Sequence, residues 1–278
     1  MRVAVVGHIE YVNLGRVPSL PRPGDIVHVE HPVAFPGGGG GVAFFQLLRG
    51  GAEVHLFTAL GGDDIGARIA TELAGTGGHI HAARRGAPHT RADVLVTPDG
   101  ERTILVVGEP MHPLRDDPLP WDLLASCDAV YFTAQDPAVL QAARAARLVV
   151  VTARRRAPLL RSGVCADVVV GSAFDPREAG HLADYPVPPT ALVQTEGAAG
   201  GWVETAAGVE RFPPAPRAPR GGAAYGSGDS FAAALTWYLA LGLTPAQAAR
   251  RAAPHGAAVL VGLNPLDSQL ALPDAAGP

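Results

Sequence analysis

The chain has 278 residues, 47% hydrophobic and 17% charged, with a formal net charge of −4. This size and composition predict a globular protein with a substantial core, and the scattered basic residues exclude the basic stripe of a nucleic-acid or membrane-surface binder. We therefore expect a small-molecule partner, with no nucleic acid and no membrane.

Arginine supplies all 22 basic residues, and the chain contains no lysine. A P-loop, a Schiff-base enzyme and a protein-kinase fold each require a lysine for their chemistry. The composition therefore excludes these three classes.

The two cysteines, Cys127 and Cys165, lack the spacing of metal ligands, and the chain does not open with the pattern of a secretory signal. No apolar run approaches the ~18 residues needed to cross a bilayer. We expect a reduced, cytoplasmic protein.

Short Val-rich runs alternate with helical patterns along the chain. The runs predict buried parallel strands at 2–7, 52–60, 129–134, 147–153, 166–171 and 190–195. The helical patterns lie at 66–75, 137–146 and 244–262, the last with Thr244 as N-cap and Pro245 at the first helical position. The alternation predicts an α/β fold with a doubly wound, mostly parallel central sheet flanked by helices.

Two segments depart from this alternation. Residues 25–35 alternate apolar and polar side chains, and residues 90–107 read as two strands around a Pro-Asp-Gly turn. Together they predict a small β-sheet that acts as a lid on a single domain spanning 1–278. A Pro-rich stretch at 213–222 leads into the last glycine-rich motif.

Two glycine-rich stretches are candidate ligand sites. The first, 37–41, has five consecutive glycines before an apolar run, and it is either a flexible turn or a loop that a ligand approaches closely. The second is the Gly-Ser-Gly-Asp sequence at 226–229. It is either a plain helix start or an anion-binding concavity of backbone amides with Asp229 as a base. The helix dipole is expected to keep Asp229 ionised.

The segments 36–66, 90–104, 195–201 and 226–235 occur in the order and spacing of the ribokinase-like, or PfkB, family of sugar and nucleoside kinases, which this chain resembles over essentially its whole length. The resemblance implies a central sheet flanked by helices with a β lid. It also implies transfer of the γ-phosphate of ATP to a substrate hydroxyl, with Mg²⁺ on the phosphates.

The resemblance also implies roles for individual residues. Asp229 matches the catalytic base, and Gly226, Ser227 and Gly228 match the anion hole over the transferred phosphate. The nucleotide-binding turn matches Thr195, Gly197 and Gly200, and the glycines that meet the substrate match Gly37 and Gly38, with Gly39 beside them.

Several family residues are replaced. Ala223 and Ala224 lie where the family has an Asp-Thr pair that helps place a monovalent cation, so we expect little cation activation. Asp175 or Glu178 would stand in for the glutamate that holds Mg²⁺ through water. The substrate-binding Asn corresponds to Gly41, and the N-terminal substrate Asp is missing, with Glu10 nearby. The substrate is therefore expected to differ from ribose-like sugars.

Other polar residues have weaker signals. Gln135 follows a predicted strand at its carboxyl end and is a candidate substrate contact, as is Arg102 on the lid hairpin, which would suit an acidic substrate. His79 and His81 would share one face of a strand, but without an evident third ligand they are interpreted as surface residues. The run at 154–156 is interpreted as a solvated helix start rather than a phosphate site.

The leading hypothesis is an ATP-dependent phosphotransferase that acts on a small polar metabolite and pairs with a second copy of itself through the lid. One alternative is a ligand-binding or regulatory protein on the same fold that has lost turnover. Another is an assembly protein that uses the exposed lid face, which predicts no stabilisation by nucleotide.

Overall fold

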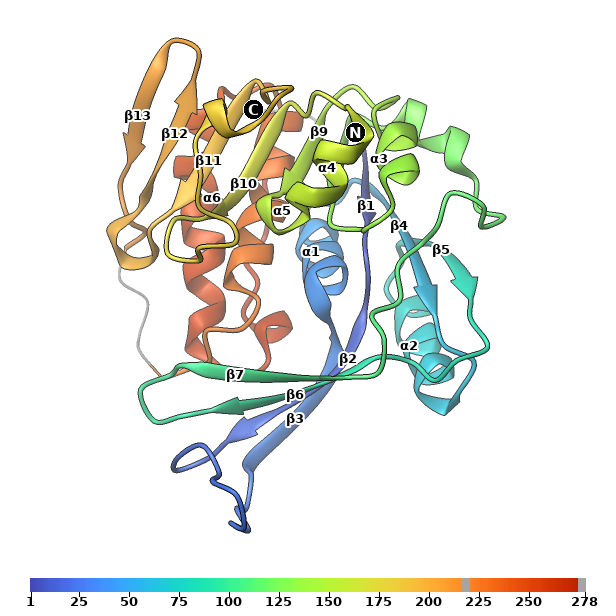
Figure 1. Cartoon of the computed structure of the whole chain (residues 1–278), viewed down its shortest axis with the longest axis vertical. Coiled ribbons are helices and arrows are strands. Elements are labelled where there is room, and N and C mark those ends of the chain that lie inside the picture. The colour runs from blue at the N-terminus through green and yellow to red at the C-terminus, as the bar shows by residue number, and fades with distance from the viewer. Residues whose placement is uncertain (217–220, 275–278) are drawn as a thin grey trace.

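The computed structural model describes residues 1–216 and 221–274. Within them a central sheet has nine strands in the order β13-β12-β11-β10-β9-β8-β1-β4-β5 (Figure 1). In that order the strands are Gly208–Phe212, Gly201–Thr205, Ala191–Thr195, Val168–Ser172, Val149–Thr152, Ala129–Phe132, Arg2–Val6, Glu53–Leu60 and His79–Arg84. From β11 to β5 neighbouring strands run parallel, and β12 and β13 add an antiparallel hairpin at one edge.

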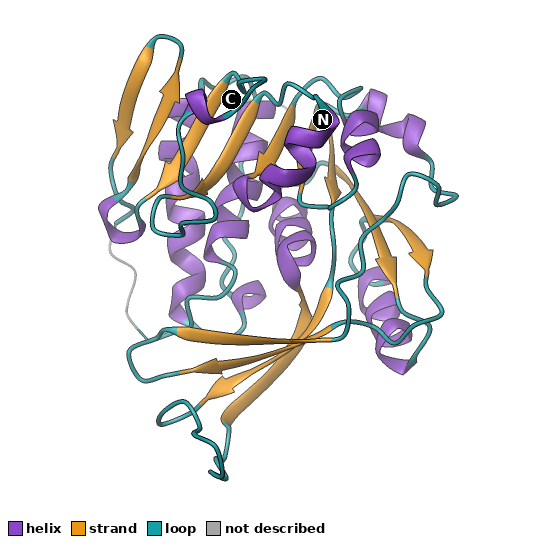
Figure 2. Cartoon of the chain, viewed as in Figure 1, coloured by secondary structure: helices purple, strands orange, loops and turns teal. Residues whose placement is uncertain are grey.

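Helices cover both faces of this sheet (Figure 2). They are α1 (Gly38–Leu47), α2 (Asp64–Ala74), α3 (Pro137–Ala143), α4 (Arg156–Ser162), α5 (Ser227–Ala240) and α6 (Pro245–Ala258). Strand β1 shows why the pattern works: Val3 and Val5 pack with α1, α5 and α6, whereas Ala4 and Val6 pack with α3 and α4. Both faces are buried, so the strand is a continuous apolar run, as expected for a covered parallel sheet. The doubly wound α/β fold is thus confirmed.

A second, four-stranded sheet lies apart from the central one, in the order β3-β2-β6-β7 (Figure 1). Its strands are β2 (Glu10–Arg16), β3 (Glu30–Gly37), β6 (Arg91–Val96) and β7 (Arg102–Val107). The predicted hairpin at 90–107 is present as β6 and β7, antiparallel around the 97–101 turn. The other predicted segment is shifted, because residues 25–29 form no strand and β3 continues to Gly37.

The small sheet packs through its inner face. Val12, Val94 and Val96 join a cluster with Val42 of α1 and with Ala223 and Tyr225, which precede α5. Strand β7, at the edge of the small sheet, is exposed on both faces from Ile104 to Val107. The sheet is therefore anchored on the two segments that carry the glycine-rich motifs.

The remaining sequence predictions of helices and strands were met in part. Helix α6 begins as predicted, with Thr244 as N-cap, Pro245 at the first position and a reciprocal bond to Gln247. Strands β2, β5, β12 and β13 were not predicted. Part of the Pro-rich stretch at 213–222, namely 217–220, lies outside the described residues. No described helix is both long and apolar enough to span a membrane.

The first prediction concerns the packing of α5 on the segment after α1. Trp237 is fully buried, and a Cβ at Gly50 would lie 2.2 Å from its Cη2 atom. Gly50→Ala should lower the free energy of unfolding by about 1–3 kcal/mol, because the indole has no room to move. Urea denaturation measures this. Gly75→Ala is the control, since its nearest neighbour would be 3.6 Å away and its φ is −77°. Equal midpoints for the two variants would contradict the prediction.

Candidate active site

The Gly-Ser-Gly-Asp sequence forms the start of α5. Gly226 precedes the helix with φ 77°, a conformation that favours glycine, and no side chain caps the helix. The first-turn amides of α5 therefore have no partner within the helix and lie at the positive end of its dipole. The Ser227 hydroxyl donates to the Gly256 carbonyl at 2.8 Å, which joins α5 to α6. The motif is thus more than a capped helix start.

The glycine run at 37–41 forms a second helix start at the same place. Gly38–Gly41 make the first turn of α1, and Gly38 has φ 72°. A Cβ at Gly39 would lie 3.1 Å from Asp229 Oδ1, and one at Gly40 would lie 2.5 Å from the His8 carbonyl oxygen. Glycine at these positions therefore lets the start of α1 lie close to both Asp229 and the segment after β1. Two positive helix termini therefore converge beside Asp229, an arrangement suited to an anion.

The environment of Asp229 sets its charge. Burial raises its pKa to about 6, and the nearby Glu178 carboxylate adds to that rise. The charges of Arg154 and Arg102 act in the opposite direction, as does the hydroxyl of Tyr131, which donates to Oδ1 at 3.4 Å. The dipole of α5 favours the ionised form, whereas burial, the largest effect on this pKa, favours the protonated form. At pH 7 the carboxylate is still roughly nine-tenths ionised.

Glu10 is a second carboxylate in this region, across from the end of β3. It begins β2, pairs in register with Gly37, and is buried. Burial raises its pKa to about 7, with a further contribution from the charge of Asp229. Its Oε1 lies 3.6 Å from His8 Nε2, but burial lowers the pKa of His8 to about 3. The histidine is therefore neutral at pH 7, and this contact is not an ion pair.

Two further polar side chains close this region. The His112 ring lies 4.9 Å from that of His8, is buried, and has no partner at either nitrogen among the described residues. The hydroxyl of Tyr225 accepts a hydrogen bond from the Gly38 amide at 2.9 Å. Sequence reasoning missed His8, His112 and Tyr225 as site residues, because they come from distant segments that only the fold brings together.

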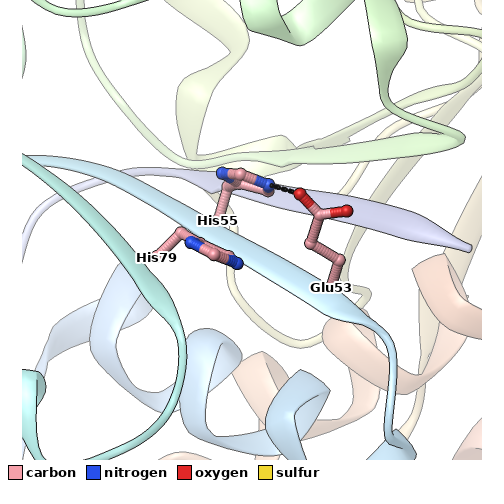
Figure 3. A group of neighbouring side chains, drawn as sticks. All are labelled: Glu53, His55 and His79. Atoms are coloured by element: carbon pink, nitrogen blue, oxygen red, sulfur yellow. Dashed lines mark hydrogen bonds and ion pairs between the residues drawn. The ribbon is translucent and has the colours of Figure 1, made fainter.

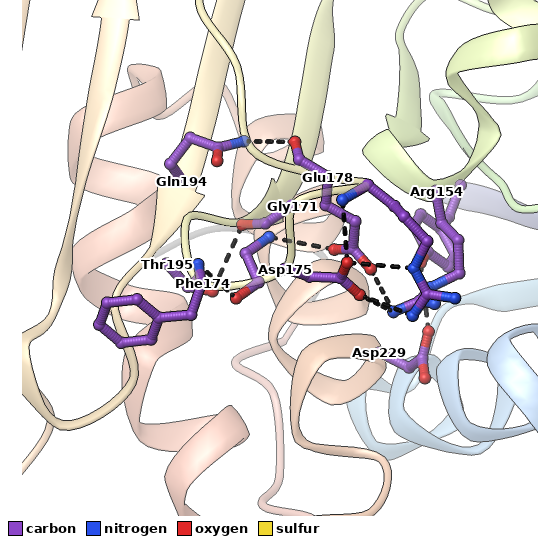
Figure 4. Close-up of polar contacts among 11 residues, drawn as sticks. Arg154, Gly171, Phe174, Asp175, Glu178, Gln194, Thr195 and Asp229 are labelled. Atoms are coloured by element: carbon purple, nitrogen blue, oxygen red, sulfur yellow. Dashed lines mark hydrogen bonds and ion pairs between the residues drawn. The ribbon is translucent and has the colours of Figure 1, made fainter. Parts of the chain in front are cut away.

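The arginine run at 154–156 is not a solvated helix start. Arg155 donates from Nε to the Thr133 carbonyl at 2.8 Å, and its charge lowers the pKa of Glu10. Arg154 lies 3.0 Å from Asp175 Oδ2 and also pairs with Glu178 (Figure 4). Two of the three arginines thus compensate the buried carboxylates of this site.

Asp175 and Glu178 are held tightly on the loop after β10. Glu178 Oε2 accepts from the Ser172 amide at 3.0 Å, and Asp175 also pairs with Arg177 at 3.0 Å. Figure 4 shows the two carboxylates side by side on Arg154, with Asp229 below. The structure therefore brings both sequence-predicted metal residues close to Asp229, already neutralised by arginine.

The turn that contains Thr195, Gly197 and Gly200 joins β11 to β12. Thr195 Oγ1 donates to the Gly171 carbonyl at 3.3 Å, and Gly200 has φ 88° with no room for a Cβ beside Phe212. Gly197 is exposed, and a Cβ there would lie 3.8 Å from the ring of Phe174, a side chain 72% exposed. Figure 4 places Thr195 and Phe174 on the far side of Glu178 from Arg154.

The two other predicted substrate contacts, Arg102 and Gln135, differ in how close they lie to Asp229. Arg102 begins β7, and its charge lowers the pKa of both Asp229 and Tyr225, so its guanidinium is near the cluster. Gln135 is exposed after β8, and no hydrogen bond or ion pair of the described residues joins it to the cluster. Its neighbour Asp136 caps α3 by accepting from the Ala138 amide at 2.9 Å.

Comparison with solved structures shows the same fold over nearly the whole chain. A putative ribokinase from Agrobacterium tumefaciens matches with a TM-score of 0.80 and 22% identity, covering 96% of this chain and 94% of that one. The ribokinase from Thermotoga maritima matches at 0.77 and 18%, covering 97% and 96%. The adenosine kinase from Sinorhizobium meliloti matches at 0.77 and 18%, covering 96% of each chain.

Comparison of the sequence gave two results. No match was found among the curated proteins. A family model described as "pfkB family carbohydrate kinase" matches residues 1–159, which is more than half of the 278 residues. The chain therefore belongs to the pfkB family of carbohydrate kinases.

Proposed function

We propose that this protein transfers the γ-phosphoryl group of ATP to a hydroxyl of a small polar metabolite, either a sugar or a nucleoside-like compound. The observation that carries the proposal is the partly buried carboxylate of Asp229 at the point where the N-termini of α1 and α5 converge. A base beside an anion site is what phosphoryl transfer to a hydroxyl requires.

The proposed mechanism uses few groups. Asp229 accepts the proton of the substrate hydroxyl, whose oxygen then bonds to phosphorus while the bond to ADP breaks. The amides at 226–228 and the dipole of α5 stabilise the charge on the moving phosphoryl group. A Cβ at Gly228 would meet no atom within 4 Å, so the first turn of α5 has open space beside it for phosphate oxygens.

The residues also fit Mg²⁺ by donor type. Carboxylate oxygens are the ligands that this ion prefers, and Glu178 and Asp175 would hold it through water. When bound, Mg²⁺ neutralises charge on the phosphates. Arg154 now pairs with both carboxylates, and its side chain is 46% exposed, so it can swing away as the ion binds.

In this proposal the nucleotide and the metabolite bind at opposite ends of the site. Thr195, Gly197 and Gly200 would border the nucleotide, and the exposed ring of Phe174 offers a face for a base to stack on. Glu10, Gly37, Gly38 and Gly39 would meet the metabolite, with Arg102 and Gln135 at its edge. Neutral His8 and His112 add hydrogen-bonding nitrogens there, which suits a substrate with several hydroxyl groups.

One structural relative supports the proposed pair of substrates. The ribokinase of Arabidopsis thaliana, which matches with a TM-score of 0.75 and 18% identity, was solved with ribose and ATP. We also propose a cytoplasmic location, which the two free cysteines favour, and pairing of two copies through the small sheet, which the exposed apolar residues of β7 favour.

A second candidate is a ligand-binding protein that has lost turnover. Arg154 favours it, because it occupies both carboxylates that Mg²⁺ would need. Thermal stabilisation by ATP and Mg²⁺, followed by a measurement of ADP release with a sugar and nucleoside panel, separates the two. Stabilisation without ADP release would favour this second candidate.

Asp229→Asn tests the proposed base. It keeps the volume of the side chain and removes its basicity, so transfer should slow by ~10²–10⁴ while nucleotide binding persists. Stopped-flow or coupled kinetics and nucleotide titration measure the two effects. Asp64→Asn is the control, because Asp64 also lies in the first turn of a helix but is exposed. If Asp229→Asn unfolds and its folded fraction turns over normally, the residue is only structural.

The pH dependence gives a further prediction. Because the ionised form of Asp229 is the base, kcat/KM should fall as pH drops through about 6, where this group gains its proton. Glu178→Gln removes a negative charge that raises this pKa and releases Arg154, so the acid limb should move to lower pH. The profile is measured at saturating Mg²⁺. Glu72→Gln, which removes a carboxylate paired with Arg68 on α2, should leave the limb in place.

The last prediction here concerns the small sheet as a lid. The 97–101 turn reaches the segment before α5, where the Ala224 amide donates to the Gly100 carbonyl at 3.2 Å. Replacing this turn with Asn-Gly should abolish substrate binding or raise ATP hydrolysis without transfer, since water would enter the site. The same replacement of Ala206-Ala207 in the β12–β13 turn is the control. Unchanged transfer kinetics in the first variant would rule out the lid role.

A further inference from the structure

A cluster of histidines and one glutamate lies on one face of the central sheet at its β5 edge. Glu53 and His55 come from β4, and His79 and His81 come from β5. Residues two apart share a face of a strand, and His55 pairs in register with His79, so the fold places all four together. Figure 3 shows Glu53, His55 and His79 converging.

The cluster is remote from the candidate active site. Glu53 lies at the start of β4 opposite Arg2, at the beginning of β1. His8 and Glu10, in contrast, follow the carboxyl end of β1. Glu53, His55 and His79 therefore lie within the first three residues of their strands, on the β5 side of the sheet, and take no part in the proposed phosphoryl transfer.

The donor atoms face one another. The Nε2 atom of His55 lies 2.9 Å from Glu53 Oε1, and the rings of His55 and His79 stack at 4.6 Å. One ligand atom from each of these three residues lies within 4.8 Å of the others. Ligands of a tetrahedral zinc ion, each about 2.0–2.2 Å from the metal, lie about 3.3 Å apart. His79 is exposed, and its ring would turn toward the other two donor atoms to complete that arrangement.

The other polar atoms of the cluster already have partners. Arg2 Nη2 pairs with Glu53 Oε2 at 3.0 Å, and His81 Nε2 lies 3.0 Å from His55 Nδ1. These contacts fix the carboxylate and the buried imidazole, and they direct Glu53 Oε1 and His55 Nε2 to the same point. Partners of this kind orient the ligands of known metal sites.

We propose that Glu53, His55 and His79 bind one zinc-class transition-metal ion, with water in the fourth position. Two imidazole nitrogens and one carboxylate oxygen suit zinc, whereas Mg²⁺ and Ca²⁺ prefer oxygen ligands. The ion ties β4 to β5, an edge strand that pairs with β4 alone in the described sheet. The bound ion therefore stabilises the fold at this edge. The sequence did not predict this site, because the spacing of His79 and His81 showed no third ligand.

Zinc titration of the full chain tests the proposal, after treatment with a chelator and without nucleotide. Calorimetry should show one ion per chain, and the thermal midpoint should rise with zinc but not with Mg²⁺. His79→Ala should weaken zinc binding at least 100-fold and remove the rise, and it should fold normally because His79 is exposed. His28→Ala, which removes another exposed histidine, is the matched control and should bind zinc as the native chain does.

His81→Ala tests the positioning contact. Loss of an outer partner of a metal ligand should weaken zinc binding by 10–100-fold without changing the stoichiometry of one. The proposal is overturned if the native chain binds no zinc with 1:1 stoichiometry. It is equally overturned if His79→Ala and His28→Ala bind zinc as tightly as the native chain, since the ion would then lie elsewhere.

Discussion

The close approach of two helix N-termini is the constraint on which the rest of the site depends. Gly39 of α1 lies so near Asp229 that a single Cβ would reach 3.1 Å from its carboxylate. This close approach limits where α5 can begin relative to α1, and it covers one side of the carboxylate. Burial then raises the pKa of Asp229 to about 6, a value at which a carboxylate can take up and release a proton near neutral pH. The packing of α1 against α5 and the raised pKa of Asp229 therefore have the same origin.

The buried carboxylates need compensation, and arginine supplies it. Asp229, Glu10 and Glu178 are close enough for Asp229 to interact electrostatically with the other two. Arg154 and Arg155 enter from the segment after β9 and lower the pKa of Asp229 and Glu10, respectively. A chain without lysine thus uses guanidinium groups, which stay charged when partly buried and can bind two carboxylates at once.

The sequence predicted the parts of this molecule whose signals are local. Val-rich runs predicted six strands of the central sheet, and Asp229 with its neighbouring glycines was located because the motif is contiguous. Strand β2 was missed because Asn13, Gly15 and Arg16 interrupt its apolar pattern, and β5 because its run is short and only half apolar. The roles of His8, His112 and Arg155 depend on which distant segments become neighbours, which periodicity cannot show.

One side chain links the small sheet to the starts of both α1 and α5. Tyr225 packs in its inner core with Phe35 and Val12, while its hydroxyl holds the Gly38 amide at the start of α1. Tyr225 also immediately precedes Gly226, which sets the start of α5. Any displacement of the small sheet therefore reaches both helix termini through the same residue. The packing of the small sheet and the geometry of the two helix starts are therefore set in part by one side chain.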